Sequence, residues 1–113
     1  MEIFYKNILA LNERLKASGK GYVLVANIPA SAENEKDASD YYRLFHMNDV
    51  CDLYTKAAAE CGFPLIRLYT LFLNYCKEND ITVDSLLCDG LHPNNKGYDV
   101  MFTLLMEELG LTT

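Results

Sequence analysis

Two short runs of branched and aromatic residues, set between helical patterns, constrain the fold of this 113-residue chain more than any other feature. Residues 22–28 form the first run, which Pro29 ends, and residues 63–69 form the second. Apolar residues at consecutive positions are typical of buried strands in a parallel sheet. Strands that alternate with helices favour a layered architecture. The sequence therefore predicts an α/β fold with parallel strands.

Apolar residues at helical spacing mark the other elements. Residues 2–18 predict a first helix, which a Gly-Lys-Gly turn stops, and a polar loop over 30–39 leads to a long helix over about 40–61. A short helix over about 71–77 and a final helix after Pro93 complete the order. The residues expected to face inward are Ile3, Phe4, Ile8, Leu11 and Leu15 in the first helix, Tyr42, Phe45, Val50, Leu53, Tyr54 and Ala57 in the long helix, and Tyr98, Met101, Phe102, Leu105 and Leu109 in the last.

Composition indicates one globular domain. Half of the residues are hydrophobic and 23% are charged, far from the balance of a disordered chain. The net charge of -6 and the lack of a basic patch or arm argue against nucleic acid or an anionic membrane as partner. No apolar stretch approaches transmembrane length, and the N-terminus lacks the pattern of a signal peptide. For the chain as given, we expect a cytoplasmic location.

The four cysteines show no Cys-x-x-Cys pair and do not meet zinc-ribbon spacing. Cys51 and Cys61 fall in one predicted helix, too far apart along its axis to bridge, so free thiols in a reducing compartment are expected. Asp89 and His92 alone would supply too few ligands for a metal ion. The sequence therefore predicts no metal and no cofactor.

Segment 89–98 sets Asp89 and His92 three residues apart, just before the final helix. Pro93 disfavours helical backbone at the residue before it and suits the first position of a helix, so we expect His92 at the helix start. Asp89 can then accept a hydrogen bond from one ring nitrogen and leave the other free to take a proton. Such a pair is the acid and base of a serine-hydrolase triad, although a histidine that caps a helix beside a carboxylate is also a common structural arrangement.

The string DGLHPNNKGY resembles the C-terminal block of the SGNH (GDSL-type) hydrolases, a lipase and acylhydrolase family. The matching residues are Asp89, His92, Pro93, Asn94, Gly97 and Tyr98. The resemblance covers essentially the whole chain and implies the C-terminal half of a flavodoxin-like three-layer α/β/α sandwich. It also implies that His92 acts as general base and then general acid, that Asp89 orients it, and that the substrate is a small ester or acylated molecule.

The family's serine, glycine and asparagine blocks have no counterpart in this chain. Residues 1–113 are therefore expected to form a single partial domain, and Met1 is compatible with an internal start, a truncation or a split gene. Ser31, just beyond the first strand, and Cys88, beside Asp89, are alternative nucleophiles with weaker support. The ordinary interpretation of Cys88 is a buried apolar thiol.

Two functions follow from these observations. The first is the C-terminal segment of a serine esterase or acylhydrolase, inactive alone and completed by an N-terminal segment. The second is a non-catalytic α/β module that associates with another copy of itself, because half of a parallel sheet leaves an open edge. The missing nucleophile keeps both functions open.

Overall fold

The computed structural model describes residues 2–31 and 47–111. Its elements are α1 (Glu2–Ala17), β1 (Leu24–Ala26), α3 (Met47–Cys61), β2 (Leu65–Arg67), α4 (Leu68–Glu78), the 3-10 helix η1 (Val83–Leu86) and α5 (Asn95–Glu108). β1 and β2 pair in parallel, with Leu24 opposite Leu65. The predicted α/β fold with parallel strands is confirmed. Within the described residues, no helix is long and apolar enough to cross a bilayer.

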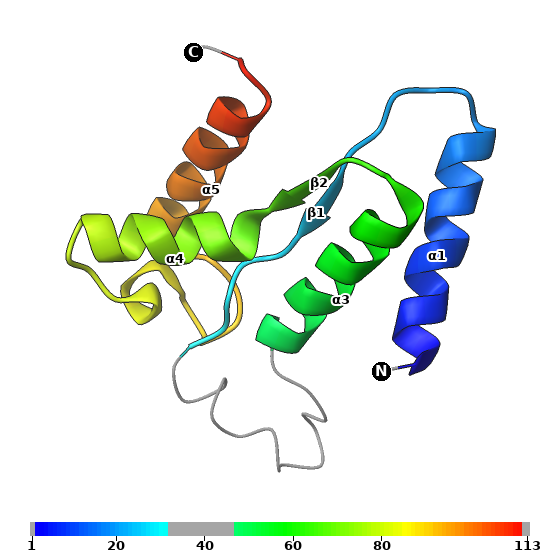
Figure 1. Cartoon of the computed structure of the whole chain (residues 1–113). Helices are drawn as coiled ribbons and strands as arrows, with labels where there is room; N and C mark the ends of the chain where they lie inside the picture. Colours follow the sequence, from blue (N-terminus) through cyan, green and yellow to red (C-terminus); the bar gives the residue numbers. More distant parts are fainter. Residues whose placement is uncertain (1, 32–46, 112–113) are drawn as a thin grey trace.

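The helices divide into two groups about the strand pair (Figure 1). α1 and α3 lie side by side, and α3 contacts both strands; α4 and α5 pack on each other, with η1 against both. Each group encloses its own apolar cluster. The buried members are Ile8, Leu24, Ala57 and Phe63 in what we name the N-terminal cluster, and Ile28, Leu68, Phe72, Cys76, Leu86, Leu87 and Val100 in the C-terminal cluster.

The face that α1 buries differs in part from the predicted one. Ile8 is buried and Phe4 and Leu15 are partly buried, as expected, but Ile3 and Leu11 are 76% and 42% exposed. Asn12 is buried in their place, and its side-chain oxygen accepts a hydrogen bond of 2.6 Å from the Tyr22 hydroxyl. The contact face is turned toward Asn12 because this polar residue has a partner there, which apolar spacing alone does not reveal.

The long predicted helix is observed as α3, and its first residues, 40–46 with Tyr42 and Phe45, lie outside the described part of the chain. Val50 and Ala57 are buried as expected. α4 begins at Leu68, earlier than predicted, directly after β2. The reason is its buried stripe, Leu68, Phe72 and Cys76, which repeats every four residues and starts at the end of the strand.

The prediction for the last helix is wrong for three residues. Tyr98, Phe102 and Leu109 are 56%, 56% and 50% exposed, whereas Met101 and Leu105 are partly buried against the C-terminal cluster. The buried positions of α5 are Gly97 and Val100. A Cβ at Gly97 would clash with the Leu86 carbonyl oxygen. This close approach, which only glycine permits, fixes the side of α5 that faces the molecule.

Candidate functional site

The segment between η1 and α5 forms a tight, closed turn. Leu87 and Pro93 make an isolated antiparallel bridge, and the Cys88 N–H donates to the His92 carbonyl oxygen at 2.9 Å. Gly90 sits at the tip with a φ of 81°, in the left-handed region that glycine adopts without cost. The turn therefore brings the two ends of 88–92 together and holds Asp89 and His92 on one short loop.

The Asp89 carboxylate makes three hydrogen bonds within this loop. One oxygen accepts from the backbone N–H groups of Leu91, at 2.9 Å, and of His92, at 2.6 Å. The other oxygen lies 2.6 Å from Nδ1 of the His92 ring. A single carboxylate thus fixes both the backbone and the ring of His92, and the sequence-predicted pair is brought together.

Electrostatics assign the proton on the His92 ring. The pKa of Asp89 is lowered to about 2, first by the backbone hydrogen bond from His92, then by the side-chain hydrogen bond from the same residue and the backbone one from Leu91. At neutral pH the carboxylate is ionised and can only accept hydrogen bonds, so Nδ1 carries the hydrogen. Nε2 is then the nitrogen that can take a proton from another group.

The pair is open to solvent, with 71% of the His92 side chain and 51% of the Asp89 side chain exposed. An exposed imidazole with a fixed tautomer can exchange protons with a group that approaches its Nε2 atom. Within the described residues, no cluster of three or more His, Cys, Asp or Glu side chains is placed to hold a metal ion. The geometry suits proton transfer.

Asn94 anchors the turn to the rest of the molecule, a role the sequence prediction missed. It caps α5: its side-chain oxygen accepts from the Gly97 N–H at 2.9 Å. Its side-chain nitrogen donates to the Ser85 carbonyl oxygen, and its backbone N–H donates to that of Leu86, both at 2.9 Å. Pro93 therefore precedes the cap instead of opening the helix. The strong preference of Asn for the N-cap position was the signal available in the sequence.

The two alternative nucleophiles both lie in or against this turn. Ser31 is buried, and its backbone N–H donates to the Gly90 carbonyl oxygen at 2.9 Å. Cys88 is a free thiol and is exposed, so its interpretation as a buried apolar residue is wrong; the reason is that the turn points it away from the C-terminal cluster that takes in Leu86 and Leu87. All four cysteines are free.

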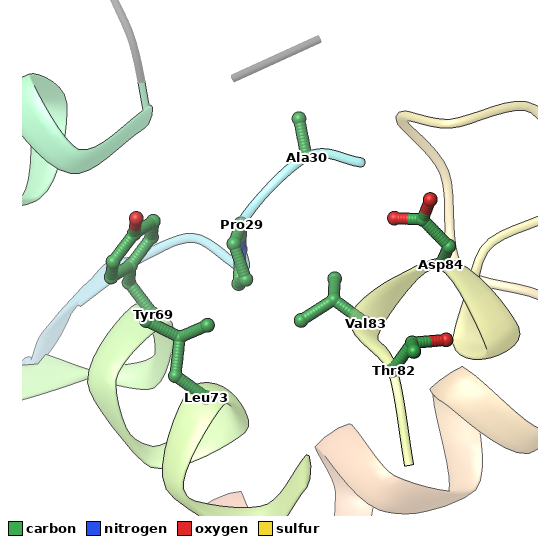
Figure 2. A pocket seen from close by; sticks show the side chains of 7 residues that line it. All are labelled: Pro29, Ala30, Tyr69, Leu73, Thr82, Val83 and Asp84. Carbon is green, nitrogen blue, oxygen red and sulfur yellow. The ribbon is translucent and has the colours of Figure 1, made fainter. Parts of the chain in front are cut away.

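The structure also contains a pocket of about 270 Å³ (Figure 2). Its walls come from the segment after β1, from α4 and from the start of η1. The residues that line it are Pro29, Ala30, Tyr69, Leu73, Thr82, Val83 and Asp84. The pocket is at the carboxyl ends of the parallel strands, the edge of an open α/β sheet where ligands bind. Sequence analysis did not identify it, because its walls come from three separate segments.

Fold and turn together define an α/β protein with a parallel strand pair and an acid-histidine turn at the start of its last helix. No protein-family model and no curated protein matches the sequence. Among solved structures, the chain is similar to a catalytic mutant of an acetylxylan esterase from Geobacillus stearothermophilus, with a TM-score of 0.71 and 17% identity. The match covers 96% of this chain and 46% of the esterase, so the chain spans about half of that structure's length.

Proposed function

We propose that this chain is the acid-base segment of an SGNH-type serine ester hydrolase, in which a complementing N-terminal segment supplies the nucleophile. The observation that carries the proposal is the Asp89 carboxylate, which holds the ring of His92 at 2.6 Å and leaves Nε2 free. The fold likeness to an acetylxylan esterase supports the same class of chemistry, since that enzyme contains a matching fold within a chain about twice as long.

The proposed chemistry is acyl transfer in two steps. Nε2 of His92 removes the proton from the serine hydroxyl of the complementing segment as its oxygen attacks the ester carbonyl. The protonated ring then gives that proton to the departing alcohol, which leaves an acyl-enzyme. In the second step His92 removes a proton from water as the water oxygen attacks the acyl carbonyl. The protonated ring then returns that proton to the departing serine oxygen, which regenerates the serine and releases the acid. Asp89 stabilises the charged ring in both steps through Nδ1.

A fusion tests this proposal. The chain replaces the matched portion of the esterase without its catalytic mutation, the remaining portion of which we propose to supply the serine, and hydrolysis of p-nitrophenyl acetate is followed. We expect His92→Ala to lower kcat by at least about 10²-fold, the contribution of a general base. Asp89→Asn is expected to lower kcat by up to about 10⁴-fold, since the ring loses the partner that sets its tautomer. A folded, active fusion whose kcat is changed by neither substitution would contradict the proposal.

The isolated chain supplies a second readout that needs no partner. Long-range ¹H–¹⁵N spectra of neutral His92 are expected to show the hydrogen on Nδ1, and Asp89→Asn is expected to change that tautomer. A predominant Nε2–H form in the unaltered chain would count against the proposed role. Ser31→Ala is the matched control: isolated-chain esterase activity that vanishes in both Ser31→Ala and His92→Ala would place the nucleophile within this chain and overturn the need for a complementing segment.

The alternative function, a self-associating α/β module without catalysis, is favoured by one observation. Tyr98, Phe102 and Leu109 form an exposed apolar stripe on α5, and Val25 on β1 is also 37% exposed. Such a surface suits contact with a second copy. Sedimentation at micromolar concentration tests it: a dimer that Phe102→Asp dissociates would favour association, whereas a monomer at all concentrations would exclude this function.

A further inference from the structure

Two of the three walls of the pocket in Figure 2 are connected to the Asp89–His92 turn. One wall, Pro29 and Ala30, runs directly into Ser31, whose backbone N–H donates to the Gly90 carbonyl oxygen in the turn. Another wall is the start of η1, and the chain passes from η1 through the bridged Leu87 to the turn. Pocket and turn are therefore one structural unit, and a ligand in the pocket is held at a fixed position relative to His92.

The lining of the pocket is mostly apolar. Pro29 and Ala30 are buried. Leu73 from α4 and Val83 from η1 also line the pocket. A cavity of about 150 Å³ lined by aliphatic and aromatic side chains admits benzene in another protein. At about 270 Å³, this pocket has room for a phenyl ring or a branched alkyl group with its point of attachment.

Charge restricts the ligand further. Asp84 lies at one side of the pocket, opposite Tyr69, and its side chain is exposed. No Lys, Arg or His stands among the seven described residues that line the pocket, and the chain as a whole carries a net charge of -6. An anionic group would find no cation to pair with among these lining residues. The lining therefore fits an uncharged ligand.

We propose that this pocket, two of whose walls are joined to the turn that carries His92, binds the apolar part of a neutral ester, a group the size of a phenyl ring or a branched alkyl chain. This inference rests on the proposed function for its link to ester chemistry, but the binding itself does not require a nucleophile. It assigns the hydrolase a preference for esters with such a group over esters whose acid and alcohol parts are both small or highly polar.

Acetophenone, the ketone that resembles a phenyl ester and cannot be hydrolysed, is the probe for the isolated chain. Methyl NMR signals of Leu73, Val83 and Ala30 are expected to shift and saturate with a Kd on the order of 1–10 mM, as for a fragment of this size. Benzoate, of similar shape and negatively charged, is expected to bind at least about fivefold more weakly, because the mostly apolar lining would desolvate its carboxylate without offering a cation. Methyl xyloside, which is neutral and polar, serves as the third probe.

A matched pair of variants on α4 locates the binding. Leu73 lines the pocket, whereas Leu71, also partly buried on the same helix, lines a different hollow against α5. Leu73→Phe narrows the pocket and is expected to weaken acetophenone binding at least about fivefold, while Leu71→Phe leaves it unchanged. Unfolding midpoints of both variants are measured first. If Leu73→Phe does not fold, Leu73→Thr replaces it, because its hydroxyl makes the lining more polar and is likewise expected to weaken acetophenone binding.

Three results would overturn the inference: acetophenone shifts that do not saturate at these methyls, benzoate or methyl xyloside binding as tightly as acetophenone, or an equal loss in the two phenylalanine variants. The outcome is separate from that of the proposed function. Saturable binding together with hydrolysis that ignores His92 would keep the pocket and reject the acid-base role. Hydrolysis that depends on His92 without binding at these methyls would do the reverse.

Discussion

The two apolar clusters differ in how completely they are closed and in what they support. In the C-terminal cluster Phe72 and Leu86 are fully buried and Leu68 is 1% exposed, whereas Leu24 and Phe63 in the N-terminal cluster retain 9% and 6%. The Asp89–His92 turn is attached to the C-terminal cluster, because Leu86 and Leu87 belong to that cluster and also hold the ends of the turn.

The N-terminal cluster is organised differently. It is flanked by a polar pair, Asn12 and Tyr22, and by the contact of Phe4 with Tyr54, whose rings meet edge to face at 5.9 Å. At the surface of the same helix pair, the Tyr5 hydroxyl donates to the Glu60 carboxylate, and the Lys56 ammonium lies 4.8 Å from the Tyr5 ring. None of these contacts touches the turn. The site therefore depends on the C-terminal cluster, whereas the N-terminal cluster stabilises the fold around it.

The largest expected effect comes from truncating one aromatic residue in each cluster. Phe72→Ala leaves a cavity at a fully buried position of the C-terminal cluster and is expected to lower the free energy of unfolding by about 3–5 kcal/mol. Phe63→Ala, at a slightly exposed position of the N-terminal cluster, is expected to cost about 3 kcal/mol, at the low end of that range. Urea denaturation measures both, and Phe72→Leu serves as the milder variant if Phe72→Ala does not fold.

The NMR signals of His92 test which of the two clusters supports the turn. In folded protein they are expected to move in the Phe72 variants and to stay in place in Phe63→Ala, because only the C-terminal cluster supports the turn. A larger loss of stability in Phe63→Ala, or equal shifts of His92 in both, would contradict the division of roles between the clusters.

The sequence predicted the elements better than the faces they bury. Runs of branched and aromatic residues and the helical spacing of apolar residues suffice to find β1, β2 and α1, because both patterns depend only on residues that are close in the sequence. They do not reveal that the buried Asn12 has a hydrogen-bond partner ten residues away, or that Gly97 lets α5 approach Leu86 and turns Tyr98 and Phe102 outward. Contacts between segments decide which face of a helix is buried. The apolar pattern of one segment does not reveal these contacts.

The same distinction holds for the site. Asp89 and His92 are three residues apart, so a local motif was enough to pair them, and the structure shows their hydrogen bond. The pocket is formed by residues from 29 to 84, and no spacing in the sequence brings them together. Asn94 lies between the two cases: its capping preference is local, but its bond to the Ser85 carbonyl oxygen is not.

A second prediction tests the close approach of α5 to η1. Gly97→Ala would place a Cβ against the Leu86 carbonyl oxygen and 2.9 Å from Cβ of Pro93, so the helix start must shift. We expect a loss of about 1–3 kcal/mol in unfolding free energy, as for overpacking, despite the better helix propensity of alanine. Gly21→Ala, where nothing lies within 4 Å, is the control and is expected to stay within about 0.5 kcal/mol. Equal effects of the two substitutions would show that α5 is not held by this contact.

A third prediction concerns the polar pair of the N-terminal region. Tyr22→Phe removes the hydroxyl and leaves the buried Asn12 side chain without its 2.6 Å hydrogen bond, which is expected to cost about 1–2 kcal/mol. The double variant Asn12→Leu with Tyr22→Phe is expected to recover most of this loss, because both polar partners are gone. Chemical denaturation of Tyr22→Phe, Asn12→Leu and the double variant measures the coupling between the two side chains. His92 signals that shift in Tyr22→Phe would show that the two regions are linked after all.

The smallest effect on stability is expected at the turn itself, from the pH dependence of Asp89. Its pKa in the folded chain, about 2, lies below the ordinary value near 3.9 for an unfolded chain, because the backbone of His92, its ring and the backbone of Leu91 all donate to the carboxylate. A lowered folded pKa means that the ionised carboxylate stabilises the fold above about pH 4 and that this contribution is lost as the pH falls toward 2. The urea midpoints of the unaltered chain and of Asp89→Asn should therefore differ at pH 6 and converge by pH 2. The difference at pH 6 is expected to be small, because half of the Asp89 side chain is exposed. A difference in midpoint that stays constant from pH 6 to pH 2 would mean that the ionised carboxylate does not hold the turn. The orientation of His92 would then have to come from the anchoring of Asn94 to the C-terminal cluster.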